Sequence, residues 1–380
     1  MRTRTMLPYG RQTIEDDDIE AVAAVLRGDW LTTGPTVTAF EEALAAAVGA
    51  PRVVSCTSGT AALHMAYAGA GVGPGDEVIT TPMTFVATAS SAVALGAKVT
   101  FVDVEPDTAN IDPAAVRAAI TDDTAVVAAV DYAGHPAELD ELNEIAHAHG
   151  ALTVEDAAHS IGATYRGRPV GSVADLTTFS FFPTKNMTTA EGGGVAALDP
   201  AIAQAVHEFH FIGLVRDRDR MRYPDEGPWH QEVHSYGVNY RLPDVLCALG
   251  LSQLAKLARF KARRTEIFAR YTEGLADVAG VTPPVVRDHV DPTWHLYPVR
   301  ILDGRRREVF DSMRERGIGV QVNYLPAHWH PLFEDQGYRR GQFPHAEQFY
   351  AEELSLPMWP GLTDQQVDQV IGELRTSLSA

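Results

Sequence analysis

Short apolar segments alternate with helix-like segments through the first 200 residues of the chain. The apolar segments that read as strands are 53–55, 78–80, 99–104, 125–130, 152–155, 177–182 and 194–198. Continuous apolar strands separated by helices are typical of a mostly parallel sheet covered on both faces. The sequence therefore predicts an α/β fold whose ligand binds beyond the carboxyl ends of the strands.

One lysine stands directly after the strand predicted at 177–182. Lys185 follows three phenylalanines and precedes three glycines in the stretch FSFFPTKNMTTAEGGG. Burying an ammonium is costly, and the same burial lowers the pKa of the amine and makes it nucleophilic toward carbonyls. Lys185 is thus a candidate Schiff-base lysine, although by itself the stretch is more typical of a solvated loop lysine, since most lysines are solvated.

Other polar and aromatic residues follow the ends of neighbouring strands. Ser58 and Thr60 lie in TSGTAAL, a small turn that enters a helix and directs backbone N–H groups at an anion. Asp156 follows the strand at 152–155, where a carboxylate either pairs with a protonated ring nitrogen or caps a helix. His159 comes three residues later, and Phe85 could stack on a flat ring. Together with the lysine, these residues match the needs of pyridoxal phosphate.

Composition excludes several classes of function. The net charge is -19, which argues against nucleic acid and anionic membranes as partners. The only cysteines, Cys56 and Cys247, have no metal-ligand spacing, so we expect a reducing, cytoplasmic setting. We also expect no signal peptide and no membrane span, since the first residues, MRTRTMLPYGRQ, contain no apolar core and no apolar run is long enough.

The length of 380 residues allows two domains. We place a large domain at 1–255 and a linking helix with a small α+β domain at 256–380. Within them we expect a helix at 13–28 capped by Thr13 and a long helix that starts after 237 and runs to about 275. In the small domain we expect helices at 306–316 and from 363, and strands at 295–301 and 320–324.

Several longer motifs carry a family resemblance. They include LTTGP, TSGTAAL, VEDAAHSIGA, FSFFPTKNMTTAEGG and GVNYRLPDVLCALGLSQL. Over essentially its whole length the chain resembles the DegT/DnrJ/StrS family of sugar aminotransferases, which have the aspartate-aminotransferase-like fold (pyridoxal phosphate fold type I). The segment EGPWHQEVHSYGVNYRL is similar to the pseudaminic-acid-type UDP-4-amino-4,6-dideoxy-N-acetyl-L-altrosamine transaminases. These enzymes aminate the C4 ketone of a UDP-linked 2-acetamido-2,6-dideoxy-4-keto-hexose.

The resemblance implies a role for individual residues. L-Glutamate would be the amino donor, and Lys185 and Asp156 would be catalytic. The cofactor would contact Gly59, Thr60 and Ser180 at its phosphate, Phe85 and His159 at its ring, and Asn239 from a neighbouring subunit. The active unit would therefore be a homodimer. The sugar nucleotide would contact Tyr9, Asp29, Trp30, Leu31, Thr32, Asn323 and Tyr324.

The substrate stays open at this stage. Asn323 stands where many members of the family have histidine, and Thr57 where they often have asparagine. A different nucleotide sugar with a keto group at C4 or C3, or a cyclitol, is an alternative. A sugar dehydratase is a weaker one, because dehydrating relatives replace the lysine that is present here as Lys185.

Two other classes of protein fit less well. A non-catalytic relative of the same fold would have no need of Lys185 or Asp156. A nicotinamide dehydrogenase lacks its motif, since the glycine-rich GAGVGPG follows a helix and precedes a strand. We read the pairs His207/His210 and His328/His330 as surface or substrate-side residues and expect no metal.

Overall fold

A seven-stranded sheet forms the centre of the structure, a computed structural model that describes residues 6–379. The strands follow the order β1-β9-β8-β5-β4-β2-β3, and all neighbours are parallel except those that involve β9. Their bounds are β1 (Arg52–Cys56), β2 (Glu77–Thr80), β3 (Lys98–Phe101), β4 (Thr124–Val130), β5 (Leu152–Asp156), β8 (Leu176–Ser180) and β9 (Gly193–Ala197). The predicted mostly parallel α/β sheet is confirmed.

Successive residues of the strands face different layers of the core. Val78 of β2 belongs to a core with the helices α3 (Gly59–Gly69), α4 (Ala87–Ala94) and α7 (Pro200–His210). Its neighbour Ile79 belongs to a core with α5 (Pro113–Ala119) and α6 (Leu139–Ala148). This period of two explains why β2 carries apolar residues at successive positions, since both faces of the sheet are covered.

The chain beyond the sheet forms a second layered unit. The long helix α9 (Leu257–Leu275) leads to a three-stranded sheet of β12 (Val281–Thr282), β14 (Tyr297–Ile301) and β15 (Glu353–Leu356). The helices of this part are α10 (Arg306–Glu315), α11 (Pro331–Glu334), α12 (Pro344–Glu352) and α13 (Asp364–Ser379), with the 3₁₀ turn η4 (Ala327–Trp329). One apolar core continues from the large sheet into this unit, so the division into 1–255 and 256–380 stays a prediction.

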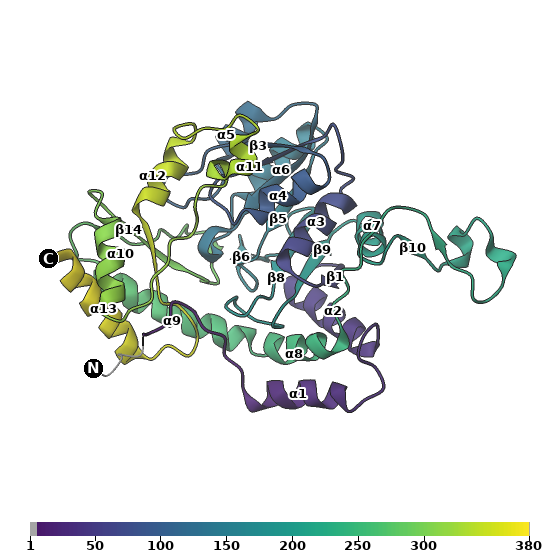
Figure 1. Ribbon diagram of the computed structural model, residues 1–380, viewed down its shortest axis with the longest axis horizontal. Helices are drawn as coiled ribbons and strands as arrows, with labels where there is room; N and C mark the ends of the chain where they lie inside the picture. The colour runs from purple at the N-terminus through teal and green to yellow at the C-terminus, as the bar shows by residue number, and fades with distance from the viewer. Residues whose placement is uncertain (1–5, 380) are drawn as a thin grey trace.

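An arm of the chain projects from the body at the right of the view (Figure 1). It is built on the short pair β10 (Leu214–Val215) and β11 (Glu232–Val233), with 3₁₀ turns η2 (Arg218–Arg220) and η3 (Pro224–Glu226) between them. Most residues of the arm are exposed, in keeping with its polar composition. The other short elements are η1 (Tyr132–Gly134), β6 (Thr164–Tyr165), β7 (Arg168–Pro169) and β13 (Val290–Asp291).

Two helices differ from their predicted bounds. The first helix, α1 (Asp16–Leu26), begins three residues later than expected. Thr13 is not its cap, because Glu15 occupies the N-cap position and its backbone N–H donates to Asp18. The predicted long helix is two helices, α8 (Asp244–Leu254) and α9, which meet at Lys256. The ammonium of Lys256 turns back to the carboxylates of Asp17 and Asp18, at 2.7 and 2.6 Å, and this contact fastens α1 to the junction.

The strand predicted at 320–324 does not form. Only Gln321 pairs there, through an isolated bridge to Ser355 of β15. The backbone N–H of Asn323 donates instead to the carboxylate of Glu353, at 2.7 Å, so no ladder continues past the bridge.

Within residues 6–379 no helix has the length and apolar content that crossing a membrane requires. Residues 1–5, on which the expectation about a signal peptide partly rests, lie outside the described residues.

Candidate active site

A cavity of about 510 Å³ opens where the parallel strands end. Its lining comes from segments that follow β1, β2, β5 and β8, together with residues of the N-terminal segment and of the loop between α10 and η4. The candidate residues that meet there are Tyr9, Gly59, Thr60, Phe85, Asp156, His159, Ser180, Lys185, Asn323 and Tyr324. Residues far apart in the sequence thus converge at one edge of the sheet, as parallel topology requires.

The first turn of α3 forms one end of the cavity. Ser58 caps this helix through its Oγ, which accepts from the Ala61 N–H at 3.1 Å. Gly59 packs so closely on β8 that a Cβ there would lie 2.8 Å from the Cβ of Ser180. The close approach brings the Ser180 hydroxyl beside the N–H groups of the helix start, at the positive end of the helix dipole. Such a cradle fits a phosphate group.

Asp156 ends β5 and is buried, with 6% of its surface exposed. Its Oδ2 accepts from the Thr88 hydroxyl at 2.7 Å, and its Oδ1 accepts from the Ala158 N–H at 3.2 Å. Burial raises the pKa of this carboxyl, while these two bonds and the nearby Lys185 ammonium oppose the rise. A carboxylate held this way can stabilise a positive charge in the cavity.

Lys185 approaches the same cavity from the turn after β8. Its backbone N–H donates to the Phe182 carbonyl at 2.9 Å, so the lysine sits on a hydrogen-bonded turn. Burial lowers the pKa of the ammonium to about 8, and the charge of Asp156 acts in the opposite direction. About a tenth of the side chain is therefore the neutral, nucleophilic amine at pH 7, against less than about a thousandth for a lysine with the ordinary pKa of about 10.4.

Aromatic side chains make up the remaining wall. The Nε2 of His159 lies 3.0 Å from the hydroxyl of Tyr324, and the ring of Phe85 meets the Tyr324 ring edge-on, with centroids 5.9 Å apart. Phe85 is 58% exposed, so its face is free to contact a ligand. Burial and the Lys185 charge hold the pKa of His159 well below its ordinary value, so its imidazole is neutral.

Sequence reasoning missed two members of this site. His295 lines the cavity and lies 4.4 Å from His159 between ring centroids. Thr88, on α4, supplies the hydroxyl that binds Asp156. His295 follows two prolines and a tryptophan-containing loop, and Thr88 lies in an alanine- and serine-rich helix, so neither stands in a pattern that marks a site.

Five predicted residues lie outside this cavity. Asn239 is exposed and pairs with Phe211 through an isolated bridge. The loop with Asp29, Trp30, Leu31 and Thr32 is also exposed and does not line the cavity. The contacts expected of these residues stay predictions.

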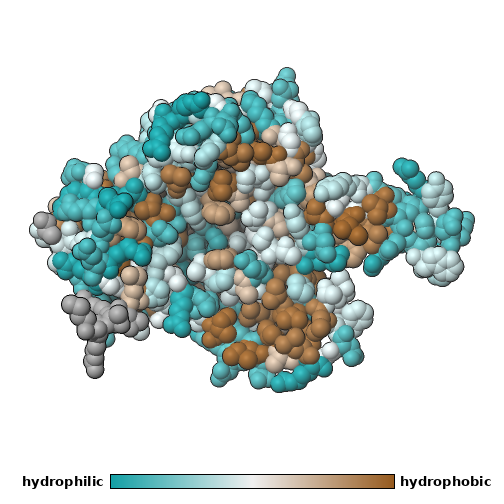
Figure 2. Space-filling view, in the orientation of Figure 1, coloured by the Kyte–Doolittle hydropathy of each residue, from teal (hydrophilic) through white to brown (hydrophobic). Residues whose placement is uncertain are grey.

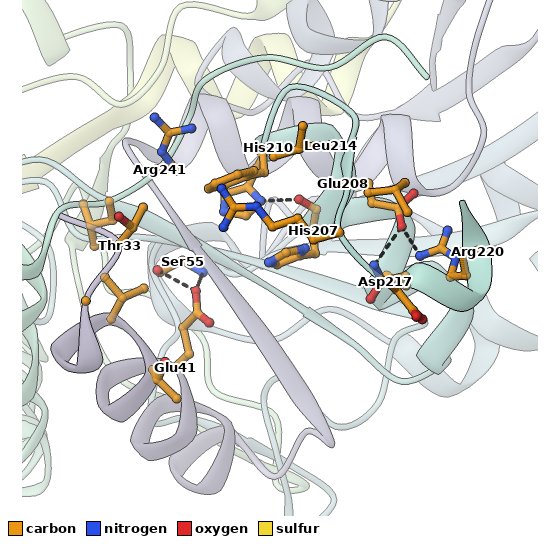
Figure 3. Close-up of a pocket in the computed structure, with 18 residues that line it drawn as sticks. Thr33, Glu41, Ser55, His207, Glu208, His210, Leu214, Asp217, Arg220 and Arg241 are labelled. Carbon is orange, nitrogen blue, oxygen red and sulfur yellow. Dashed lines mark hydrogen bonds and ion pairs between the residues drawn. The ribbon is translucent and has the colours of Figure 1, made fainter. Parts of the chain in front are cut away.

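A second cavity, of about 370 Å³, lies between α2 (Pro35–Val48), α7 and the base of the arm (Figure 3). His207 and His210 line it, with ring centroids 4.9 Å apart, and burial lowers the pKa of His210 to about 4. Glu208, which lies between these two histidines in the sequence, forms an ion pair with Arg220 and not with either histidine. Among residues 6–379 no group of three or more histidine, cysteine, aspartate or glutamate side chains is arranged to hold a metal ion.

A lysine with a lowered pKa, a buried carboxylate and a phosphate cradle meet at the carboxyl edge of the sheet, and this set fits pyridoxal phosphate. Fold and site together define a pyridoxal-phosphate-dependent aminotransferase of fold type I. The comparisons with known proteins narrow this class. The chain belongs to the DegT/DnrJ/EryC1/StrS aminotransferase family, whose model matches residues 12–375.

Named relatives agree with this membership. The spore coat polysaccharide biosynthesis protein SpsC of Bacillus subtilis is 38% identical over 97% of this chain and 96% of its own length. Among solved structures, PseC of Helicobacter pylori, an aminotransferase involved in pseudaminic acid biosynthesis, has a TM-score of 0.91 at 30% identity and covers 99% of this chain and 100% of its own. Spr1654 of Streptococcus pneumoniae, assigned as a sugar aminotransferase, has a TM-score of 0.92 at 29% identity in its PLP form and covers 98% of this chain and 99% of its own.

The lowered pKa of Lys185 predicts how cofactor uptake depends on pH. Covalent uptake needs the neutral amine, so its rate in cofactor-free enzyme is expected to rise about tenfold between pH 7 and pH 9, with a midpoint at a pKa of about 8. Stopped-flow absorbance after addition of pyridoxal phosphate measures this rate. In Asp156→Asn the midpoint should move lower, since the Asp156 charge raises the lysine pKa. A profile still rising at pH 10 would show an ordinary, solvated lysine.

Proposed function

We propose that this sugar aminotransferase transfers an amino group from L-glutamate to the C4 carbon of a UDP-linked 2-acetamido-2,6-dideoxy-4-keto-hexose. The observation that carries the proposal is the cavity, in which Lys185 and Asp156 share a space with a polar wall of Tyr9, Asn323 and Tyr324. Such a wall suits a ligand with hydroxyl and amide groups, as a sugar has. The likeness to PseC supports the choice of sugar.

The proposal assigns the site residues to the cofactor as follows. Gly59, Thr60 and Ser180 would hold the phosphate at the start of α3, and Asp156 would keep the ring nitrogen protonated. Phe85 and His159 would contact the ring. Bound there, pyridoxal phosphate supplies an aldehyde for the lysine and a ring that withdraws electrons from the reacting carbon.

Lys185 also handles the protons of the reaction. With its pKa lowered to about 8, its amine can take a proton at one substrate carbon and return it at another near neutral pH. His159 is neutral and bound to Tyr324, so it orients ligands rather than competing for that proton. The same lysine then serves both the donor and the acceptor half-reaction.

A panel of nucleotide keto sugars tests the substrate. The holoenzyme is first treated with L-glutamate, and the loss of its visible absorption is recorded. Each sugar is then added, and mass spectrometry follows conversion of the ketone to an amine. We expect the UDP-linked 4-keto sugar to restore the absorption and to yield the amino sugar. Restoration by a dTDP- or GDP-linked sugar alone would identify a different nucleotide, and sugar conversion without glutamate would identify a dehydratase.

The homodimer is part of the same proposal. Figure 2 shows apolar side chains gathered over α1 and α8 and around the base of the arm. On this chain Ile19 is 57% exposed, Leu26 58% and Trp30 58%, which is unusual for large apolar residues that remain in water. Asn239 does not line the cavity of its own chain. The carbonyl of the next residue, Tyr240, nevertheless accepts a hydrogen bond from the backbone N–H of Thr57, next to the phosphate cradle at the start of α3. A second copy facing this surface would place Asn239 at the partner's phosphate.

Mixed dimers test whether the subunits share their sites. Lys185→Ala and Asn239→Ala subunits are each expected to be impaired alone. When they are unfolded and refolded together, half of the dimers contain one intact site, so activity should recover to about a quarter of the wild-type level. Light scattering checks that both variants are dimers. No recovery from two correctly folded dimers would place Asn239 outside the partner's site.

A further inference from the structure

A buried carboxyl group lies behind the polar wall of the cavity, one layer away from any ligand. Glu353 begins β15 and is fully buried. Its Oε2 accepts from the backbone N–H of Asn323 at 2.7 Å, and its Oε1 binds the hydroxyl of Ser355. Because side chains two residues apart on a strand share a face, Glu353 and Ser355 present their polar atoms to the same segment.

The network continues from these two residues into the cavity wall. The Asn323 Nδ2 donates to the hydroxyl of Ser355 at 3.1 Å and to the hydroxyl of Tyr9 at 2.8 Å. The carbonyl of Asn323 accepts from the hydroxyl of the buried Tyr132. Asn323 is thus held at its backbone N–H, its carbonyl and its side chain, while Asn323 and Tyr9 both line the cavity.

This arrangement decides which atoms the wall offers to a ligand. Both amide hydrogens of Asn323 are used within the protein, which leaves its Oδ1 as an acceptor. Tyr9 accepts the bond from Asn323, and its hydroxyl also lies beside the hydroxyl of Ser355. Because Ser355 donates its own proton to Glu353 and not to Tyr9, the Tyr9 hydroxyl can turn its proton toward a ligand. Burial is the main reason that the pKa of Tyr9 lies well above its ordinary value, and the negative charge of Glu353, when that group is ionised, adds to the rise. The phenol therefore keeps its proton.

We propose that Glu353, acting through Ser355, is a positioning residue that sets Asn323 and Tyr9 as an acceptor and donor pair for the sugar. The pair matches two neighbouring polar groups on the substrate, one that donates and one that accepts a hydrogen bond. This inference rests on the proposed function, because it takes the Tyr9 and Asn323 wall as the sugar side of the cavity. Glu353 itself touches neither the sugar nor the cofactor site, since it does not line the cavity.

The protonation state of Glu353 suggests a conservative variant. Burial raises the pKa of this carboxyl to about 8. The hydrogen bonds from Ser355 and Asn323 and the charge of Arg306 lower the pKa but do not outweigh the burial. The side chain is therefore neutral near pH 7, where glutamine has the same shape and charge. Glu353→Gln keeps an acceptor for the Asn323 N–H and a polar group beside Ser355, whereas Glu353→Leu keeps neither.

The test compares the two half-reactions of the holoenzyme. In Glu353→Leu the KM for the sugar should rise at least about tenfold while kcat stays within about threefold. Glu353→Gln should stay near wild type, and Ser355→Ala should fall between them. The rate of the glutamate half-reaction should not change in any of these variants. Glu352→Gln is the matched control, because this neighbouring carboxylate binds Arg300 and not Asn323.

A second measurement requires no substrate. In protein labelled with ¹⁵N-asparagine, the side-chain amide signals of Asn323 are assigned by their absence in Asn323→Ala. They should exchange slowly with solvent in the wild type, Glu353→Gln and Glu352→Gln, and rapidly in Glu353→Leu. Unchanged exchange in the leucine variant, an unchanged KM for the sugar, or an equal loss in both half-reactions would overturn the proposal. If the wild type aminates none of the sugars, the proposed function fails, and the exchange measurement alone decides whether Glu353 positions Asn323.

Discussion

Lys185→Ala is expected to lower turnover by at least about 10³-fold without unfolding the protein. General acid–base catalysis by one side chain contributes about 10²–10⁴-fold. Under the proposed function this lysine would also attach the cofactor covalently. The change removes no packing that the sheet depends on, because Lys185 stands on a turn after β8 and reaches into a cavity. Turnover is measured with saturating glutamate and the best sugar of the panel, and circular dichroism reports the fold.

Two further observations separate this result from a general loss of structure. Borohydride should fix the cofactor on the wild-type chain and not on Lys185→Ala, as mass spectrometry of the intact protein would show. The control Lys261→Ala removes an ammonium that binds the Gly162 carbonyl and Asp291 outside the cavity, and it should keep wild-type activity. Normal turnover in Lys185→Ala would end the assignment of this residue.

The sequence predicts the sheet and much of the cavity because both follow from local patterns. A strand that is buried on both faces carries apolar residues on both, so β4 stands out in the sequence as the nearly continuous apolar run TAVVAAV. Once the strands are parallel, residues that follow their carboxyl ends must lie near one another. Asp156 and Lys185 are therefore predictable as neighbours, although 29 positions separate them in the sequence.

The parts that could not be predicted depend on contacts between distant segments. The segment at 320–324 has the composition of a strand, but the Asn323 N–H finds the carboxylate of Glu353 instead of a neighbouring strand. The break between α8 and α9 lies at Lys256, whose partners are on α1, more than 200 residues earlier. Thr88 gains its role only through Asp156. Local propensity carries no information about such partners.

The second large effect is expected from Asp156→Asn, which should lower turnover about 10²–10³-fold, the usual cost of removing one preorganised electrostatic group. Asparagine has the size of aspartate. Its amide oxygen can still accept from the Ala158 N–H, while its NH2 group would donate to the Thr88 hydroxyl oxygen in place of accepting from it, so the cavity should keep its shape. What is lost is the negative charge that, under the proposed function, would hold a proton on the cofactor ring. Both half-reactions should therefore slow together, measured as single turnovers with glutamate and with the sugar.

A neighbouring carboxyl provides the control for this charge. Glu155 precedes Asp156 on β5, and successive side chains of a strand point to opposite faces of the sheet. The carboxylate of Glu155 accepts a hydrogen bond from the Thr177 hydroxyl at 2.9 Å on the face opposite to Asp156. Burial raises the pKa of Glu155, while the side chains of Asp131 and Thr177 oppose the rise; Glu155→Gln keeps the size and polarity of this side chain. It should keep turnover within about threefold. Equal losses in Glu155→Gln and Asp156→Asn would mean that disruption of β5, and not the charge at the cavity, slows the enzyme.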